Sequence, residues 1–293
     1  MAKFPGQSVI TEFLVDIPVR LFFGVFNLLP HRIALALAGW ITKYLLAPPF
    51  GVNRRIRENL TRVWPDMKPA DQTRLCREIS DNSARLMLET FLPQRFVARA
   101  REAALLGPGC EILLEALAAE KPVILVSGHF GNFQAVRVAL ADRGYASAGI
   151  YRPMNNRFTN ARYVRKLDRI AAPNFSRGIS GTKALLGHLR KGGMIALLND
   201  QAAAEGRALS FFGHPALTMT SAAEFARKYQ ALLFPCYGVR LQDGASFRVE
   251  VERPISGDDP VAMTQALNDS LESVVRRYPG QWFWVHRRWK TWG

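Results

Sequence analysis

The chain has 293 residues, of which 48% are hydrophobic and 22% charged, and its formal net charge is +15. This length allows a sizeable core, and the three cysteines (Cys76, Cys110 and Cys236) are too scattered to indicate a disulfide framework or a zinc site. The strong positive charge favours a polyanionic partner, either an anionic membrane surface or an acidic carrier protein. Nucleic acid is the least supported partner, because the sequence has no helix-turn-helix, zinc-finger or RNP-like motif.

The first part of the chain is strongly apolar. Residues 10–29 and 33–46 are each predicted to be helical, but Glu12, Asp16 and Arg20 make the first segment a poor membrane-spanning helix. We expect a hydrophobic helical hairpin that lies in the membrane interface, although two buried core helices would have the same pattern. A basic cluster that could contact anionic lipid headgroups follows at once: Arg54, Arg55, Arg57 and Arg62.

From residue 51 onward, short apolar runs alternate with amphipathic segments. The predicted strands are residues 123–126, 145–151, 194–198, 232–237 and 247–251. The predicted helices are residues 53–65, 69–92, 111–120, 135–142, 158–170, 181–189, 221–229 and 264–277, and residues 210–220 are predicted to be a loop. This alternation is typical of an α/β fold with a mixed, largely parallel central sheet flanked by helices. We therefore divide the chain into an N-terminal segment of membrane-anchoring hydrophobic helices (1–50) and a single α/β domain (51–293).

One histidine stands where such folds place their sites. The buried run of residues 123–126 is broken by Ser127 and Gly128, and His129 follows directly. The ligands of open α/β sheets bind at the carboxyl ends of the parallel strands. We therefore interpret His129 as a general base, the alternative being a histidine whose ring bonds a loop carbonyl.

Polar residues also follow two further strands of the predicted sheet, Arg152 after one and Asp200 after the other. We expect Arg152 to bind an anion in the cleft beside His129, and we expect Asp200 to lie in the same cleft. The alternative for Arg152 is a surface ion pair, and the alternative for Asp200 is a helix N-cap. Thr218, Thr220 and Arg287 are further candidates for substrate binding. The tryptophans near the carboxyl end are expected to pack in the core: Trp282, Trp284 and Trp289.

These segments, in this order, resemble the motifs of one enzyme family. They are residues 127–134 (Ser-Gly-His-Phe-Gly-Asn-Phe-Gln), 151–156, Asp200, 211–216 with Thr218 and Thr220, and 284–290. The first resembles the H-x4-D/E box of glycerolipid acyltransferases, in the form found in the lipid A late acyltransferases. The hydrophobic N-terminus and the basic segment 53–60 also suit that family, so the resemblance covers nearly the whole chain.

The resemblance implies an enzyme at the cytoplasmic face of the bacterial inner membrane. It would move an acyl chain from acyl carrier protein to a hydroxyl of a lipid A precursor, although the same motifs suit a lyso-aminolipid or lysophospholipid acceptor, or coenzyme A in the donor. No cofactor is expected beyond the thioester donor, and no metal, because the histidines are scattered. In this chemistry His129 removes the hydroxyl proton, and the backbone N–H groups of Gly131 and Asn132 stabilise the oxyanion.

The chain departs from the family pattern at Gln134, where the family has Asp or Glu. A carboxylate there would orient His129 and stabilise its imidazolium, whereas an amide carries no charge. Three interpretations stay open: Gln134 is an inactivating replacement, another carboxylate such as Asp200 takes its role, or the protein is a non-catalytic lipid-binding homologue. If Gln134 belongs to the catalytic pair, Gln134→Glu should raise acyl transfer by orders of magnitude.

Overall fold

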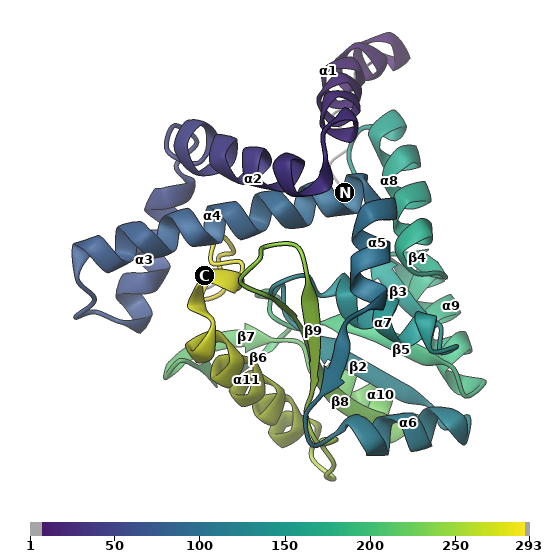
Figure 1. Ribbon diagram of the computed structural model, residues 1–293. Helices are drawn as coiled ribbons and strands as arrows, with labels where there is room; N and C mark the ends of the chain where they lie inside the picture. Colours follow the sequence, from purple (N-terminus) through teal and green to yellow (C-terminus); the bar gives the residue numbers. More distant parts are fainter. Residues whose placement is uncertain (1–7, 291–293) are drawn as a thin grey trace.

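The structure is a computed structural model that describes residues 8–290, and a seven-stranded sheet forms its centre (Figure 1). In spatial order the strands are β1 (Ala104–Leu106), β9 (Phe247–Val251), β8 (Leu232–Arg240), β2 (Val123–Ser127), β5 (Met194–Leu198), β3 (Ser147–Tyr151) and β4 (Asn174–Ser176). All neighbouring strands are parallel except β8 and β9. The predicted α/β class with a mixed, largely parallel sheet is therefore confirmed.

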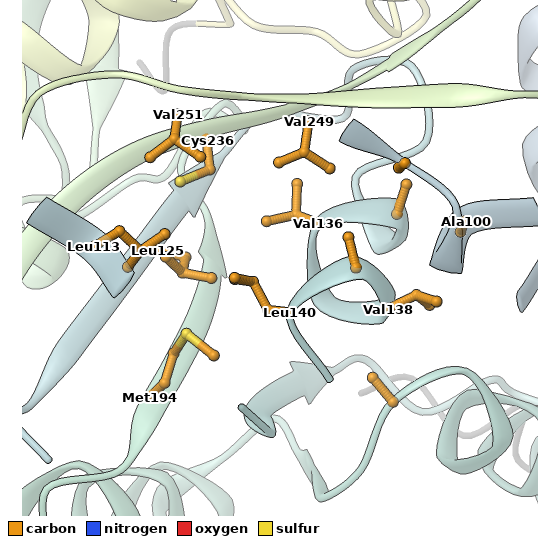
Figure 2. Packing of buried hydrophobic residues seen from close by; sticks show 14 of the residues in the cluster. Ala100, Leu113, Leu125, Val136, Val138, Leu140, Met194, Cys236, Val249 and Val251 are labelled. Carbon is orange, nitrogen blue, oxygen red and sulfur yellow. The ribbon is translucent and has the colours of Figure 1, made fainter. Parts of the chain in front are cut away.

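Helices cover both faces of this sheet, because its central strands are apolar on both sides. One face carries α5 (Pro93–Arg101), α6 (Cys110–Ala118), α7 (Gln134–Asp142) and α8 (Arg157–Ile170), and the other carries α9 (Ile179–Arg190), α10 (Ser221–Lys228) and α11 (Pro260–Arg277). Figure 2 shows the first face, where Val136 and Leu140 of α7 lie in one cluster with Leu125 of β2 and Met194 of β5. Burial on both faces keeps β2 in the middle of the sheet, so residues that follow β2 emerge at the centre of the sheet edge.

The N-terminal part of the chain is helical. Its elements are α1 (Val9–Leu28), α2 (His31–Ile41), a π-helical turn (Thr42–Leu46), α3 (Val52–Val63) and α4 (Pro69–Phe91). Helix α2 packs along α4, on the side of α4 away from the sheet, and α1 projects beside α8 (Figure 1). Within residues 8–290, no helix combines the length and the hydropathy needed to cross a membrane. The two helices predicted before residue 47 are confirmed, whereas a membrane anchor in residues 1–50 is not supported by this finding.

The charged residues that interrupt the first apolar segment bind α1 to the body of the protein. Asp16 is buried and accepts hydrogen bonds from Arg162 and Thr159 of α8. One helical turn earlier, Glu12 accepts from Nε of Arg157 over 2.8 Å. This polar side of α1 is therefore held on α8, while many apolar side chains of α1 are exposed.

Residues 210–220 are predicted to be a loop, but most of them belong to a β-hairpin. Strands β6 (Arg207–Phe211) and β7 (His214–Thr218) pair antiparallel around Phe212 and Gly213. Both turn residues have positive φ angles, 53° and 73°. Such a turn usually carries Asn or Asp before the glycine, so a phenylalanine in that position hides the hairpin from sequence analysis. Helix α5 and the short strands β1 and β4 were likewise not predicted.

A separate hydrophobic cluster joins the helical N-terminal part to the carboxyl end of the chain. It contains Ile56 and Leu60 of α3, residues of α4 and α11, and Trp282 and Trp284. The packing predicted for these tryptophans is confirmed, since both are almost fully buried. A 3-10 turn (Pro279–Gln281) leads the chain into this cluster, and the residues after it lie against the segment that follows β2.

Candidate active site

The carboxyl ends of β2 and β5, which are neighbours in the sheet, bring His129 against Asp200. Nδ1 of His129 lies 2.7 Å from Oδ1 of Asp200, and the backbone N–H of His129 donates to Oδ2 over 2.7 Å. Because an ionised carboxylate can only accept, the ring proton lies on Nδ1 and the lone pair on Nε2. The side chain of His129 is 23% exposed, so a bound molecule can reach the ring.

Asp200 is fully buried, and the groups around it keep it charged. Nε1 of Trp282 donates to Oδ2 of Asp200 over 2.9 Å, beside the bond from His129. Burial by itself raises the pKa of Asp200, but the electrostatic interaction with His129 and the hydrogen bonds that His129 donates outweigh burial and hold this pKa below its ordinary value. Asp200 is therefore a carboxylate at neutral pH, and it fixes the orientation of His129.

The carboxyl-terminal segment covers another side of His129. The N–H of Phe283 donates to the carbonyl of His129 over 2.9 Å, and the ring of His286 lies edge-on to the His129 ring with 4.7 Å between centroids. Nε2 of Gln201, the residue after Asp200, lies 3.1 Å from Nε2 of His286 and 3.5 Å from Nε2 of His129. The nitrogen that could take up a proton therefore faces Gln201 and His286.

The turn after His129 is fixed by contacts that use its backbone N–H groups. Gly131 donates to the carbonyl of Gln281 over 2.8 Å, and Asn132 donates to the carbonyl of Gly238 over 3.0 Å. Gly131 has a φ of 53°, and a Cβ there would lie 2.0 Å from the Gly238 oxygen, so glycine is required. This geometry corrects the prediction that these two N–H groups stabilise an oxyanion, because neither has a free proton to donate.

A buried ion pair supports the same turn. Nη1 and Nη2 of Arg240, at the end of β8, donate to the two carboxylate oxygens of Glu89 on α4 over 2.6 and 2.7 Å. Nδ2 of Asn132 donates to Oε2 of Glu89 over 2.8 Å. All three side chains are buried, so Asn132 holds the turn in place and is not exposed to a substrate.

In a comparison with known protein families, residues 3–291 match the family described as bacterial lipid A biosynthesis acyltransferase. The chain belongs to this family. The "Lipid A biosynthesis acyltransferase" of Haemophilus influenzae is 26% identical to it over 180 residues, which cover 60% of this chain and 56% of that protein. The "Lipid A biosynthesis lauroyltransferase" of Escherichia coli K12 is 23% identical over 250 residues, which cover 80% of this chain and 78% of that protein. The family resemblance inferred from the motifs is confirmed.

Gln134 stands at the acidic position of the H-x4-D/E box, at the start of α7, and its side chain points to another partner. Its Oε1 accepts from Nη1 of Arg137 over 3.4 Å, and both residues are buried. The carboxylate that bonds His129 is Asp200, which the sequence left open as an alternative. Burial lowers the pKa of Arg137 to about 10, so Arg137 stays charged at neutral pH beside the amide of Gln134. The catalytic role assigned to Gln134 stays a prediction, and the geometry favours Asp200 for that role.

We therefore expect Gln134→Glu to change the acyl-transfer rate by less than about tenfold, which corresponds to about 1.4 kcal/mol. The new carboxylate would lie beside the buried guanidinium of Arg137 and pair with it rather than with His129. The measurement is kcat of the two proteins in the same assay. An increase of about 100-fold or more would contradict this expectation and place position 134 in the catalytic pair.

Three of the predicted binding residues lie outside the His129–Asp200 pair. Arg152 follows β3, is exposed, and is separated from the strand of His129 by β5. Arg287 is exposed, next to His286. Thr220 precedes α10, where its hydroxyl donates to Glu224 over 2.6 Å. The substrate-binding roles of these three residues stay predictions.

Thr218 is placed differently from its prediction. Its side chain is fully buried, and its hydroxyl donates to the carbonyl of Ala216 over 2.9 Å and accepts from Nη2 of Arg288 over 2.6 Å. Arg288 is also fully buried and donates to the carbonyl of Leu217 over 3.0 Å. Thr218 therefore holds the hairpin against the carboxyl-terminal segment, and its prediction as a substrate-binding residue is not supported.

The sequence patterns did not indicate Trp282 as the partner of Asp200, and they did not indicate the pair formed by Glu89 and Arg240. Nothing near Trp282 in the sequence distinguishes an indole that bonds a carboxylate from one that only packs. Glu89 does carry a signal, because it is a charged residue between Leu88 and Phe91 on the apolar side of a predicted helix. A charge in that position indicates a buried partner, although it does not identify it.

Proposed function

We propose that this protein transfers a fatty acyl chain from the thioester of acyl carrier protein to a hydroxyl of a lipid A precursor. The observation that carries the proposal is the His129–Asp200 pair, which leaves Nε2 of His129 unprotonated and within reach of a bound molecule. Membership of the lipid A acyltransferase family supports the class of acceptor. The net charge of +15 suits both an acidic carrier protein and a phosphorylated lipid.

In the proposed reaction, the acceptor hydroxyl gives its proton to Nε2 of His129 as its oxygen attacks the thioester carbonyl carbon. A C–O bond forms, and the carbonyl oxygen takes up an electron pair and becomes an oxyanion. The carboxylate of Asp200, 2.7 Å from Nδ1, stabilises the imidazolium that results. When the C–S bond breaks, the departing thiolate takes the proton from His129. One hydroxyl and one thioester are thus converted to one ester and one thiol.

The exposed apolar surface of the N-terminal helices supports a membrane route for the lipid acceptor. On α1, Ile10, Leu21 and Leu28 are 71%, 64% and 82% exposed, and Phe50 beyond the π-helical turn is 77% exposed. Apolar patches of this kind mark contacts with membranes or with other proteins. We propose that α1 and α2 lie in the headgroup region of the inner membrane at its cytoplasmic face, with the cationic side of α3 toward anionic lipids.

The test is an acyl-transfer assay with the full chain in vesicles that contain anionic phospholipid. Labelled acyl carrier protein thioester is the donor, and a lipid A precursor, a lyso-aminolipid and a lysophospholipid are offered in separate reactions. We expect the lipid A precursor to gain the mass of one acyl chain. Label that appears only in a lysolipid would overturn the proposed acceptor. If no lipid gains a chain although donor and acceptor both bind, the protein is a non-catalytic homologue.

A further inference from the structure

Acyl transfer needs a hydrogen-bond donor for the oxyanion, and three backbone N–H groups of the turn after His129 are already bonded to protein carbonyls. The N–H groups of Gly131 and Asn132 donate to protein carbonyls, and that of Phe130 donates to the carbonyl of Gly128 over 2.8 Å. A side chain next to Nε2 of His129 can take this role. The side-chain amide of Gln201, 3.5 Å from that nitrogen, is in position to do so.

The two histidines determine which end of the Gln201 amide faces them. Nδ1 of His129 carries its ring proton toward Asp200, so Nε2 of His129 can only accept. Burial, together with the electrostatic interaction with His129, lowers the pKa of His286 to about 4, so His286 is neutral at physiological pH. A neutral imidazole has one accepting nitrogen, and because the amide nitrogen of Gln201 lies 3.1 Å from Nε2 of His286, that nitrogen is Nε2. The NH2 group of Gln201 has one hydrogen for each ring. The amide nitrogen therefore lies toward both rings.

We propose that Gln201 is a catalytic residue that donates a hydrogen bond to the oxyanion, and that His286 is the positioning residue that holds its amide. This inference rests on the acyl transfer proposed above. One amide hydrogen stays on Nε2 of His286, 3.1 Å away. The other is displaced from His129 when the acceptor hydroxyl binds there. Because the attacking oxygen and the oxyanion are bonded to the same carbon, a donor beside the first can reach the second.

The surroundings of the two residues suit these roles. Gln201 is exposed, so a substrate can contact its amide. His286 is held from two directions, because its N–H donates to the carbonyl of Phe283 over 3.2 Å and its carbonyl accepts from Asn59 of α3 over 3.0 Å. The ring of Phe283 packs edge-on against that of His286, with 4.6 Å between centroids. A fixed acceptor thus orients a donor that would otherwise move freely in solvent.

The first experiment replaces the donor and keeps the shape of the side chain. Gln201→Met is expected to lower kcat by about 100- to 1,000-fold with little change in KM for the acceptor, because the hydrogen bond forms only as negative charge develops. Gln201→Ala serves as a second variant and should lose as much. Gln94→Met, on the exposed side of α5, is the matched control and should behave as the unaltered protein. The proposal is overturned if both Gln201 variants keep kcat within about threefold of the control.

The second experiment separates positioning from a purely structural role. His286→Phe keeps an aromatic ring but cannot accept the hydrogen bond from Gln201, and it should lower kcat about tenfold. His286→Gln places an amide oxygen near the position of the His286 Nε2 atom, and it should keep most of the rate. In the double variant Gln201→Met, His286→Phe, the second change should add almost nothing. A His286→Phe effect that persists in full on the Gln201→Met background would overturn the positioning role. An unaltered protein without any transfer activity would instead refute the proposed function itself.

Discussion

Asp200→Asn is expected to lower kcat for acyl transfer by about 10⁴-fold. The oxygen of the new amide can still accept from the backbone of His129 and from Trp282, so the NH2 group would face Nδ1 of His129. Nδ1 would then have to accept, the ring proton would move to Nε2, and His129 could no longer remove a proton from the acceptor hydroxyl. The measurement is steady-state kcat, with KM for the acceptor as the internal reference.

Asp258→Asn is the matched control, since the carboxylate of Asp258 is fully exposed and its ion pair with Arg227 is long, at 4.0 Å. We expect this variant to keep the full rate. Nitrogen chemical shifts of the His129 ring should show the proton on Nε2 only in Asp200→Asn. If Asp200→Asn retains more than about a tenth of the rate, the catalytic pair proposed for this protein is wrong.

The second large effect is on stability. Glu89→Gln is expected to lower the free energy of unfolding by about 3–5 kcal/mol, because the charge of Arg240 would stay buried without a counterion. The side chains of Glu89 and Arg240 are 0% and 6% exposed, so water cannot replace the lost charge. Asn132 would also lose the carboxylate that accepts its amide proton, which loosens the turn after His129. Urea denaturation gives the free energy of unfolding directly.

An exposed pair on the same helix provides the comparison. Glu78→Gln removes a charge that pairs with Arg74 at 2.9 Å, but these side chains are 45% and 58% exposed. Solvent screens such a pair, and the expected loss is at most about 1 kcal/mol. Equal losses for Glu89→Gln and Glu78→Gln would contradict the view that burial makes the Glu89–Arg240 pair important for stability.

Most of the regular structure and the position of the central histidine could be predicted from the amino-acid sequence. The predicted strands at residues 194–198 and 247–251 coincide with β5 and β9, and the helix predicted at 69–92 differs from α4 by one residue. These segments could be predicted because the spacing of apolar residues is a local property. His129 could be found for the same reason, since it directly follows a buried strand.

The residues that surround that histidine could not be predicted in the same way, because they come from distant parts of the chain. Asp200 lies 71 positions from His129, and Trp282 lies a further 82 positions along the chain, yet all three meet because β2 pairs with β5 and the carboxyl end returns to the same edge. The motif pointed to Gln134 as the partner, but that side chain faces Arg137. Strand order and the path of the chain terminus depend on packing between distant segments, which local spacing does not record. The chemistry proposed for this protein depends on that packing.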